Sequence, residues 1–262
     1  SIEEISDLLD EDEYDESYSI NNGVYTCVLK EGAKLSGKIT VPGTYEGKPV
    51  VEFSGLDQKP NITHIYFKNP DTMRALYGFE GSKELKVVDW PSGLRRLGGR
   101  AFAFCSKLKF DAEKFANTSL AHIGTNCFTA AFDVSSGGIP LIRLPSTIRQ
   151  IDTRAFRNIN QDSLPAGNFL IEEVSFGSPT KPSNFNFDSG VVNASEIFEQ
   201  NKLTHIPNYT GATLNTPIKK FIYYKDPSNV GFTTDVFKYY IEGSKVNDEN
   251  DILEIEVAGI NE

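Results

Sequence analysis

The sequence contains few of the cysteines from which disulfide-rich or zinc-binding domains are built. Its 262 residues include only three cysteines, one methionine and one tryptophan. Cys27, Cys105 and Cys127 form an odd set without a Cys-x-x-Cys pair, so neither a disulfide framework nor a zinc site is predicted. We therefore expect the protein to hold no metal ion and no cofactor.

An excess of positive charge and long apolar runs are also missing. The chain has 26 Lys and Arg against 36 Asp and Glu, a formal net charge of −10. This balance argues against sequence-independent nucleic-acid binding, which needs Lys and Arg to displace counterions. No apolar run approaches the roughly 20 residues of a bilayer-spanning helix, and no basic-then-apolar signal peptide is visible. We expect neither nucleic acid as a partner nor a membrane-spanning segment.

Familiar catalytic motifs are absent as well. The chain contains no GxSxG, GxGxxG, P-loop or HExxH sequence. Its three histidines, His64, His122 and His205, occupy non-equivalent positions in the repeat described below. We therefore expect no enzymatic activity. Carboxylates are abundant, however, and two of them could meet as in glycosidases, so a carbohydrate-active enzyme stays open as an alternative.

What the sequence does contain is a repeated unit, clearest in the stretch LKVVDWPSGLRRLGGRAFAFCSKL over residues 85–108. It opens with a strand-like piece that Pro91 ends, because proline cannot donate a ladder hydrogen bond. Apolar or small residues then recur at Leu94, Leu97, Gly98, Ala101, Phe102, Cys105 and Leu108. One copy cannot bury its own apolar side, so the unit is typical of one coil in a stack.

Further copies occur on both sides of this unit. LAHIGTNCF at 120–128 and IPLIRLPSTIRQIDTRAF at 139–156 repeat its order, and strand-like pieces begin near Ile39 and Ile62. Ile39, Ile65 and Val88 are 26 and 23 residues apart, within the range of about 20–29 for leucine-rich repeats. Later apolar triplets lie at 171–176, 218–223 and 252–257. The stretch 177–190, rich in Ser, Pro and Asn, is predicted to be an exposed insertion.

The order LxxVxWPxxLxxLGxxAFxxCxxL resembles the unit of the BspA-like, or Treponema-type, leucine-rich repeat family. The tract KITVPGTYEGKPVVEF also resembles the opening unit of many members, and the resemblance covers about residues 25–225. It implies an α/β-type repeat solenoid, a right-handed coil with one short parallel strand per turn, mostly strand and loop. It also implies secretion or display on a bacterial surface and adhesion to host proteins or other cells.

The chain divides into two parts. Residues 1–19 contain no Lys or Arg and are predicted to be an acidic leader or linker, although Ile2, Ile5, Leu8 and Leu9 have spacing compatible with a short helix. Residues 20–262 form the repeat domain. Its clearest units span 36–176, and irregular or capping coils follow over 177–262.

The repeat also predicts the core. Phe102, Phe128 and Phe156 hold the same position in successive units, so their rings are expected to stack through the interior. Gly98 and Gly124 are expected to let the backbone turn sharply. Cys105 is expected to pack as a small buried apolar residue.

Residues that alternate with the inward set are predicted to cover the outer face of the strands, although half-exposed strands that bind nothing often look similar. Aromatic residues and Arg dominate binding hot spots, so Tyr66, Val87, Leu141 and Arg143 are the preferred anchors. The complete predicted binding set is Thr63, His64, Tyr66, Lys86, Val87, Asp89, Leu141, Arg143, Glu172 and Glu173.

These features lead to one principal hypothesis. The protein is a monomeric, non-enzymatic adhesion module, extracellular or on a bacterial surface, that recognises a protein or glycan through its strand face. On this hypothesis, we expect a signal peptide or lipid anchor to have been removed. The alternatives are a structural scaffold, such as a virion or cytoplasmic assembly protein, and the carbohydrate-active enzyme.

Overall fold

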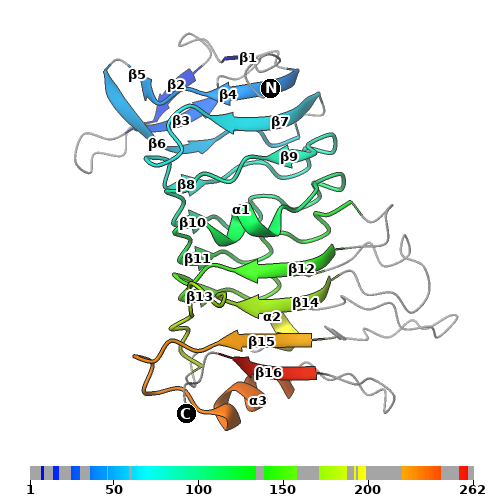
Figure 1. The fold of residues 1–262 in the computed structure, drawn as a ribbon. Coiled ribbons are helices and arrows are strands. Elements are labelled where there is room, and N and C mark those ends of the chain that lie inside the picture. Colours follow the sequence, from blue (N-terminus) through cyan, green and yellow to red (C-terminus); the bar gives the residue numbers. More distant parts are fainter. Residues whose placement is uncertain are drawn as a thin grey trace, which may run out of the picture.

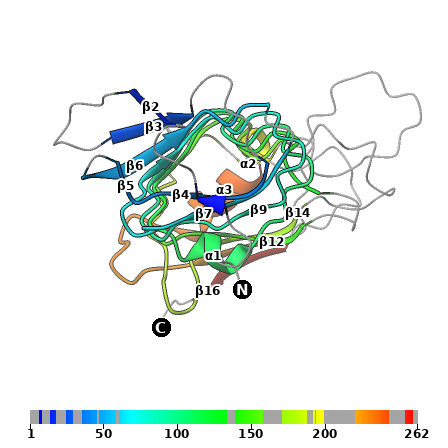
Figure 2. The ribbon, with the colours of Figure 1, turned by 90° about the horizontal axis from the view of Figure 1, so that it is seen from above.

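The chain winds into a stack of coils (Figure 1). The computed structural model describes residues 7–8, 14–17, 25–29, 36–45, 47–58, 61–133, 139–157, 171–187, 192, 194–198, 220–242 and 254–258. Seen along the stack, successive coils lie over one another (Figure 2). The predicted repeat solenoid, built mostly from strands and loops with parallel sheets, is confirmed.

One side of the stack is a wall of parallel strands, which we call the front wall. Its first sheet has the order β1 (Asp7–Leu8), β4 (Gly37–Val41), β7 (Ile62–Phe67) and β9 (Val87–Val88). Helix α1 (Ala112–Ala116) follows in the stack (Figure 1). The wall then continues with β12 (Ile139–Leu144), β14 (Ile171–Phe176), β15 (Lys220–Tyr224) and β16 (Glu254–Ala258).

A second row of strands, the side ladder, runs along another side of the coils, and the sequence did not predict it. Its parallel core consists of β6 (Lys48–Ser54), β8 (Ala75–Leu76), β10 (Arg96–Leu97), β11 (His122–Ile123) and β13 (Gln150–Ile151). At its end β3 (Tyr25–Leu29) pairs with β6, β2 (Tyr14–Ser17) runs antiparallel to β3, and β5 (Thr44–Tyr45) forms a hairpin with β6. Most coils therefore carry two strands.

The predicted stacking of Phe102, Phe128 and Phe156 is confirmed, and the stack is longer than predicted. The ring centroids of Phe102 and Phe128 are 5.6 Å apart at 11°, and those of Phe128 and Phe156 are 5.1 Å apart at 15°. Phe79 extends the stack at one end, 4.7 Å from Phe102, and Phe198 extends it at the other, 5.4 Å from Phe156. All five rings are fully buried, so each coil contributes an aromatic ring to one continuous core.

The predicted role of the two glycines is wrong. Neither Gly98 nor Gly124 has a left-handed φ, whereas Arg100 and Asn126, two residues further along, have φ values of 57° and 55°. The glycines are needed instead because the coils approach closely. A Cβ on Gly124 would lie 2.5 Å from the backbone nitrogen of Gly99, and one on Gly98 would overlap the ring of Tyr77.

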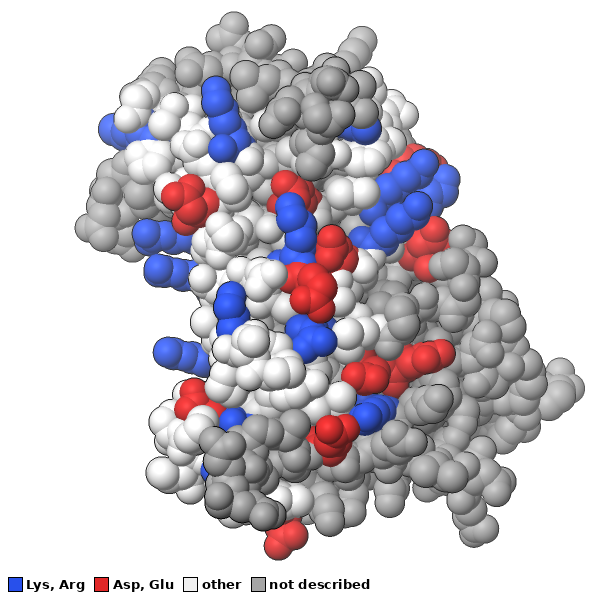
Figure 3. Space-filling model, in the orientation of Figure 1, with Lys and Arg blue, Asp and Glu red and all other residues white. Residues whose placement is uncertain are grey.

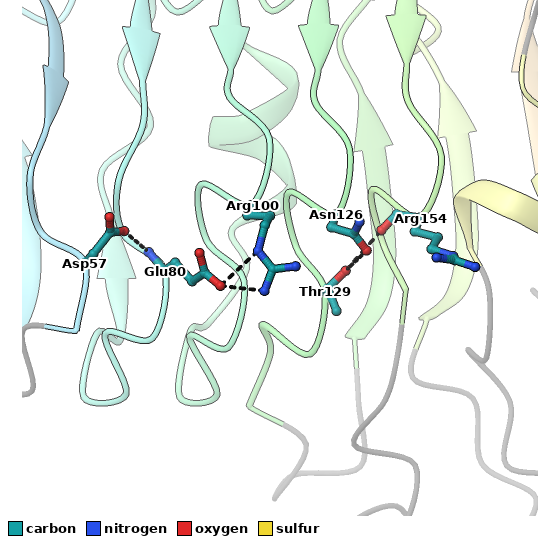
Figure 4. A network of polar contacts seen from close by, with 6 residues as sticks. All are labelled: Asp57, Glu80, Arg100, Asn126, Thr129 and Arg154. Carbon is teal, nitrogen blue, oxygen red and sulfur yellow. Dashed lines mark hydrogen bonds and ion pairs between the residues drawn. The ribbon is translucent and has the colours of Figure 1, made fainter.

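Polar contacts link the turns that follow the side ladder (Figure 4). The backbone N–H of Glu80 donates to Oδ1 of Asp57 at 2.8 Å, and Nε and Nη2 of Arg100 donate to Oε1 of Glu80 at 2.9 and 2.6 Å. The Thr129 hydroxyl donates to the carbonyl oxygen of Arg154 at 3.3 Å. The Arg100–Glu80 pair is exposed, so it adds little stability and mainly orders these turns.

Cys105 and Cys127 are core residues, as Cys105 was predicted to be. The Cys105 thiol donates to the carbonyl oxygen of Phe79 at 3.0 Å. Burial raises the pKa of Cys105 to about 12, and it also raises the pKa of the fully buried Cys127 thiol. Both thiols therefore stay protonated near neutral pH, where a reactive cysteine would need its thiolate.

The acidic leader is partly built into the sheets. Residues 7–8 form β1, with Asp7 paired to Ile39 of β4, and residues 14–17 form β2, paired to β3. The helix considered for this segment is therefore wrong at Asp7–Leu8. A sheet edge offers unpaired backbone groups to any neighbouring extended segment, and this pairing outweighs the weak helical spacing.

The expectation of an exposed insertion over 177–190 is wrong for part of that stretch. Phe185 and Phe187 are only 1% and 7% exposed, and their rings lie 5.2 and 5.4 Å from that of Phe176. Helix α3 (Thr234–Glu242) packs Phe237 and Tyr240 into the same cluster, while α2 (Ala194–Ile197) precedes Phe198 of the stack. In the described residues of 177–262 the coils keep an aromatic core.

Candidate functional site

Helix α1 lies on the front wall between β9 and β12 (Figures 1 and 2). Asp111 caps it, because its Oδ1 accepts a hydrogen bond from the backbone N–H of Lys114 at 3.1 Å. Phe115 anchors the helix in the core, where its ring lies 5.3 Å from Trp90 and 4.8 Å from Phe110. The repeat pattern does not predict this helix, although an Asp followed by AEKFA is a recognisable helix start.

Ion pairs connect α1 to the strands on both of its sides. Lys114 pairs with Asp89, directly after β9, and Glu113 Oε1 lies 3.3 Å from Nε of Arg143 in β12. Positive and negative side chains accordingly alternate down the middle of this face (Figure 3). The Arg143 side chain is only 18% exposed, and Glu113 supplies a compensating negative charge beside it. These pairs fix the helix relative to the wall.

Beside α1 the front wall is hollowed into a cavity of about 820 Å³, which we call the α1 groove. Val87, Phe110 and Leu141 supply apolar surface, while Asp89, Lys109 and the start of the helix supply charge. The complete lining is Tyr66, Val87, Val88, Asp89, Lys109, Phe110, Asp111, Ala112, Glu113, Lys114 and Leu141. Apolar walls with a few fixed polar groups are typical of ligand-binding clefts.

The structure brings together some of the ten predicted binding residues. Tyr66, Val87, Asp89 and Leu141 line the α1 groove although they come from three different coils, and Arg143 contacts the helix through Glu113. The others lie apart from the groove. Thr63, His64 and Lys86 lie in the early part of the wall, in or just before β7 and β9, and Glu172 and Glu173 lie on β14.

Tyr66 differs from its prediction as an exposed anchor. It is only 8% exposed, although it borders the groove, and burial raises the pKa of its phenol. Its ring stacks on that of His64, with centroids 6.1 Å apart at 25°. Tyr66 therefore forms part of the groove's wall and offers little free surface of its own.

The wall beside Tyr66 is basic. Burial, and then the positive charges of Lys38, Lys86 and Lys109, lower the pKa of His64. The ring nitrogen Nδ1 of His64 lies 2.8 Å from the Thr63 hydroxyl. Three lysines therefore give this end of the wall a local positive charge.

A polar cluster around Asp152 links two neighbouring coils. Nε2 of His122 lies 2.7 Å from Oδ2 of Asp152 in the next coil, and the Gln150 amide donates to Oδ1 of Asp152 at 2.8 Å. In the groove, Asp89 and Glu113 are each paired with a cation. Among the residues that the structure describes, no three His, Cys, Asp or Glu side chains are placed to hold a metal ion.

Comparison with known proteins identifies a family. The model of the BspA type Leucine rich repeat region matches residues 55–160 and 117–218, with six copies of the repeat. Among solved structures, a leucine-rich repeat protein of T. pallidum is 20% identical with a TM-score of 0.48, over 64% of this chain and 70% of that one. A leucine-rich repeat protein of Bacteroides ovatus is 14% identical with a TM-score of 0.34, over 95% of this chain and 76% of that one.

No curated protein matches the chain. Within the described residues, none of the helices has the length and apolar character to span a bilayer.

Proposed function

The chain belongs to the BspA type leucine-rich repeat family, and from this premise we propose that it is a non-enzymatic adhesion module that binds a protein partner in the α1 groove. The module works outside the cell or on a bacterial surface. The observation that carries the proposal is the convergence of Tyr66, Val87 and Leu141, from three separate coils, on one cavity beside a helix.

The lining of the groove favours a protein over a glycan as its occupant. Val87, Phe110 and Leu141 offer an apolar floor into which an aliphatic or aromatic side chain fits, and such anchors carry most of the energy of protein interfaces. The charged rim carries both signs, with Lys109 against Asp111 and Glu113. A rim of this kind selects the orientation and identity of a partner more than it adds affinity.

The groove has a different design from a hydrolase site. A glycosidase needs one carboxylic acid with a raised pKa and a second, free carboxylate. Asp89 and Glu113 instead form ion pairs with Lys114 and Arg143, so neither of these carboxylates is free. A scaffold that serves only as a rigid spacer would have no use for an apolar hollow on its wall.

The proposal is tested by selecting peptides from a random library on the immobilised protein and measuring their affinity for a groove variant. Val87→Thr combined with Leu141→Asn places polar groups in the floor at nearly constant volume. Purified extracellular-matrix proteins are tested in parallel. We expect the selected peptides to contain an apolar anchor. Their affinity for the groove variant should be lower than for the unmodified protein by about tenfold or more, equivalent to about 1.4 kcal/mol.

The matched control is Val230→Thr combined with Tyr239→Asn, which changes two apolar residues that are 92% and 83% exposed and lie far along the chain. The control should bind as the unmodified protein does. If the selected peptides bound the groove variant and the control with equal affinity, recognition would occur elsewhere on the molecule. A cooperative urea transition in both variants excludes loss of the fold as the cause.

A further inference from the structure

The arginines of this acidic chain are confined to its central coils. All of them lie between residues 74 and 157, whereas the lysines are spread from Lys30 to Lys245. The arginines are Arg74, Arg95, Arg96, Arg100, Arg143, Arg149, Arg154 and Arg157.

The side ladder brings four of these arginines into one narrow stripe. The backbone N–H of Arg95 donates to the carbonyl of Arg74 at 2.8 Å, that of Ala121 to Arg95 at 2.9 Å, and that of Arg149 to Ala121 at 2.9 Å. These residues therefore form a row along the stack, with a spacing of about 4.8 Å per coil. Arg96 lies in the adjacent row, in register with His122.

The side chains of the stripe are exposed and available. Arg74, Arg95, Arg96 and Arg149 are exposed, and none of them forms an ion pair with a residue that the structure describes. Blue side chains project one above another from the left edge of Figure 3, where Figure 1 places β8 to β13. We call the four residues the arginine stripe.

Acidic groups close to the stripe do not cancel its charge. Asp152 is held by His122 at 2.7 Å and by the amide of Gln150 at 2.8 Å. Glu52 lies on β6, at the end of the stripe, and pairs in register with Ala75. Asp152 is therefore already engaged by His122 and Gln150, and Glu52 lies only at one end of the stripe.

We propose that the arginine stripe binds a sulfated polysaccharide laid along the side ladder. A guanidinium group presents a planar fork of N–H donors that matches two oxygens of an oxyanion, which an ammonium group cannot do. A row of such forks, in which Ala121 takes one position, suits a linear polymer that carries sulfate groups along its length. Arginine instead of lysine at all four positions is the feature that this ligand explains.

The net charge of −10 is compatible with such a ligand. Exposed charges act over about 10 Å at 0.1 M ionic strength, so a polymer one sugar wide experiences the stripe more than the acidic remainder of the surface. A flat anionic membrane would bring that acidic remainder close as well. The net negative charge of the protein therefore disfavours binding to an anionic bilayer more strongly than binding to a narrow polysaccharide.

Single-stranded nucleic acid is also narrow, but it draws affinity from bases stacked on exposed aromatic rings. Tyr77, the aromatic residue near Arg96, is half-buried, and its ring packs against Gly98. Tyr77 directly follows β8, and the strands β8, β10, β11 and β13 themselves contain no Phe, Tyr or Trp. The arginine stripe therefore offers guanidinium donors to sulfate groups but no exposed aromatic ring on which a base could stack.

The test is fluorescence anisotropy of a labelled heparin oligosaccharide with the whole chain, at salt concentrations between about 50 and 200 mM. We expect binding that weakens steeply with salt, because counterions are released from the polymer. Arg74→Gln, Arg95→Gln, Arg96→Gln and Arg149→Gln together should lower the affinity at least about tenfold and flatten the salt dependence. The four Arg→Lys replacements should give an intermediate affinity, since charge remains but the fork is lost.

The matched control removes equal charge outside the side ladder through Lys68→Gln, Lys83→Gln, Lys181→Gln and Lys225→Gln, which neither surround His64 nor line the α1 groove, and it should bind heparin as the unmodified protein does. Chemically desulfated heparin should not bind. An equal loss of heparin affinity in the stripe variant and the lysine control would overturn the proposal. Undiminished heparin binding by the stripe variant would overturn it as well. Tighter binding of oligothymidine or of phosphatidylserine vesicles than of heparin would also overturn it. The groove variant described above leaves the stripe intact, so the two proposals fail independently.

Discussion

Replacing Phe128 with alanine is expected to lower the free energy of unfolding by about 3–5 kcal/mol. Phe128 is fully buried in the middle of the stack, and its ring contacts those of Phe102 and Phe156. It also meets Trp90 edge-on at 5.9 Å and Phe132 at 5.4 Å. The substitution removes contacts from both neighbouring coils at once and leaves a cavity that two rigid walls cannot close.

Urea denaturation followed by circular dichroism measures this loss. The matched control is Tyr239→Ala, which removes an aromatic ring that is 83% exposed and should change stability by less than about 0.5 kcal/mol. If Phe128→Ala unfolded at the same urea concentration as the control, the aromatic stack would not be the source of the stability of the coils.

Replacing Gly124 with alanine is expected to destabilise the protein by about 3 kcal/mol, the upper part of the range for overpacked sites. The added Cβ would lie 2.5 Å from the backbone nitrogen of Gly99 and 2.7 Å from the carbonyl carbon of Gly98. Backbone atoms of a hydrogen-bonded ladder cannot move aside as the end of a side chain can. Two adjacent coils would have to separate locally.

Gly99→Ala is the control for this prediction, because its Cβ would lie 3.4 Å from the nearest atom, the carbonyl oxygen of Thr125. Thermal unfolding of both variants should show a clearly lower Tm for Gly124→Ala and nearly the original Tm for Gly99→Ala. Equal Tm values would mean that Gly124 is not the point of closest approach between coils.

Much of the fold could be predicted from the sequence, because the positions of apolar residues in the unit at 85–108 show which side chains face the core. Phe102, Phe128 and Phe156 stack as their equivalent positions require, and the inward residues Ile65, Val88 and Ile142 are buried. A repeat fixes which side chains face inward once one copy is understood, since each coil meets the same neighbours.

Departures from the repeat were the part that could not be predicted. The helix α1 replaces a strand in a unit whose sequence no longer follows the motif, and its short length gives only a weak helical signal. The two-residue strands of the side ladder, such as Arg96–Leu97, are too short to show alternation. Phe185 and Phe187 lie among Ser, Pro and Asn residues that suggest a loop, yet tertiary packing buries them.

The candidate site shows the same division. Alternation along β7, β9 and β12 found Tyr66, Val87, Asp89 and Leu141, which line the groove. It could not find Phe110, Glu113 or Lys114, because their position depends on α1. It also could not show that Tyr66 would be covered. The arginine stripe was missed because it lies on the side ladder and not on the strand face from which the binding residues were drawn.

The two proposed surfaces lie on different sides of the same coil, as Figures 1 and 2 show for the front wall and the side ladder. Groove and stripe could therefore be occupied together. A protein anchored in the groove and a polysaccharide along the stripe would each contribute to attachment without competing for the same residues. Two weak contacts joined on one rigid body can give a high combined affinity.

The central claim, that successive coils are hydrogen-bonded to one another around a shared aromatic core, is tested most directly by native-state hydrogen exchange. The backbone N–H groups of Phe102, Phe128 and Phe156 donate to carbonyl oxygens of the following coil at 2.8, 2.7 and 2.9 Å. We predict that these three amides are among the slowest to exchange, with protection close to the free energy of global unfolding. Exchange of these amides as fast as that of exposed turn residues such as Ser92 would contradict the account.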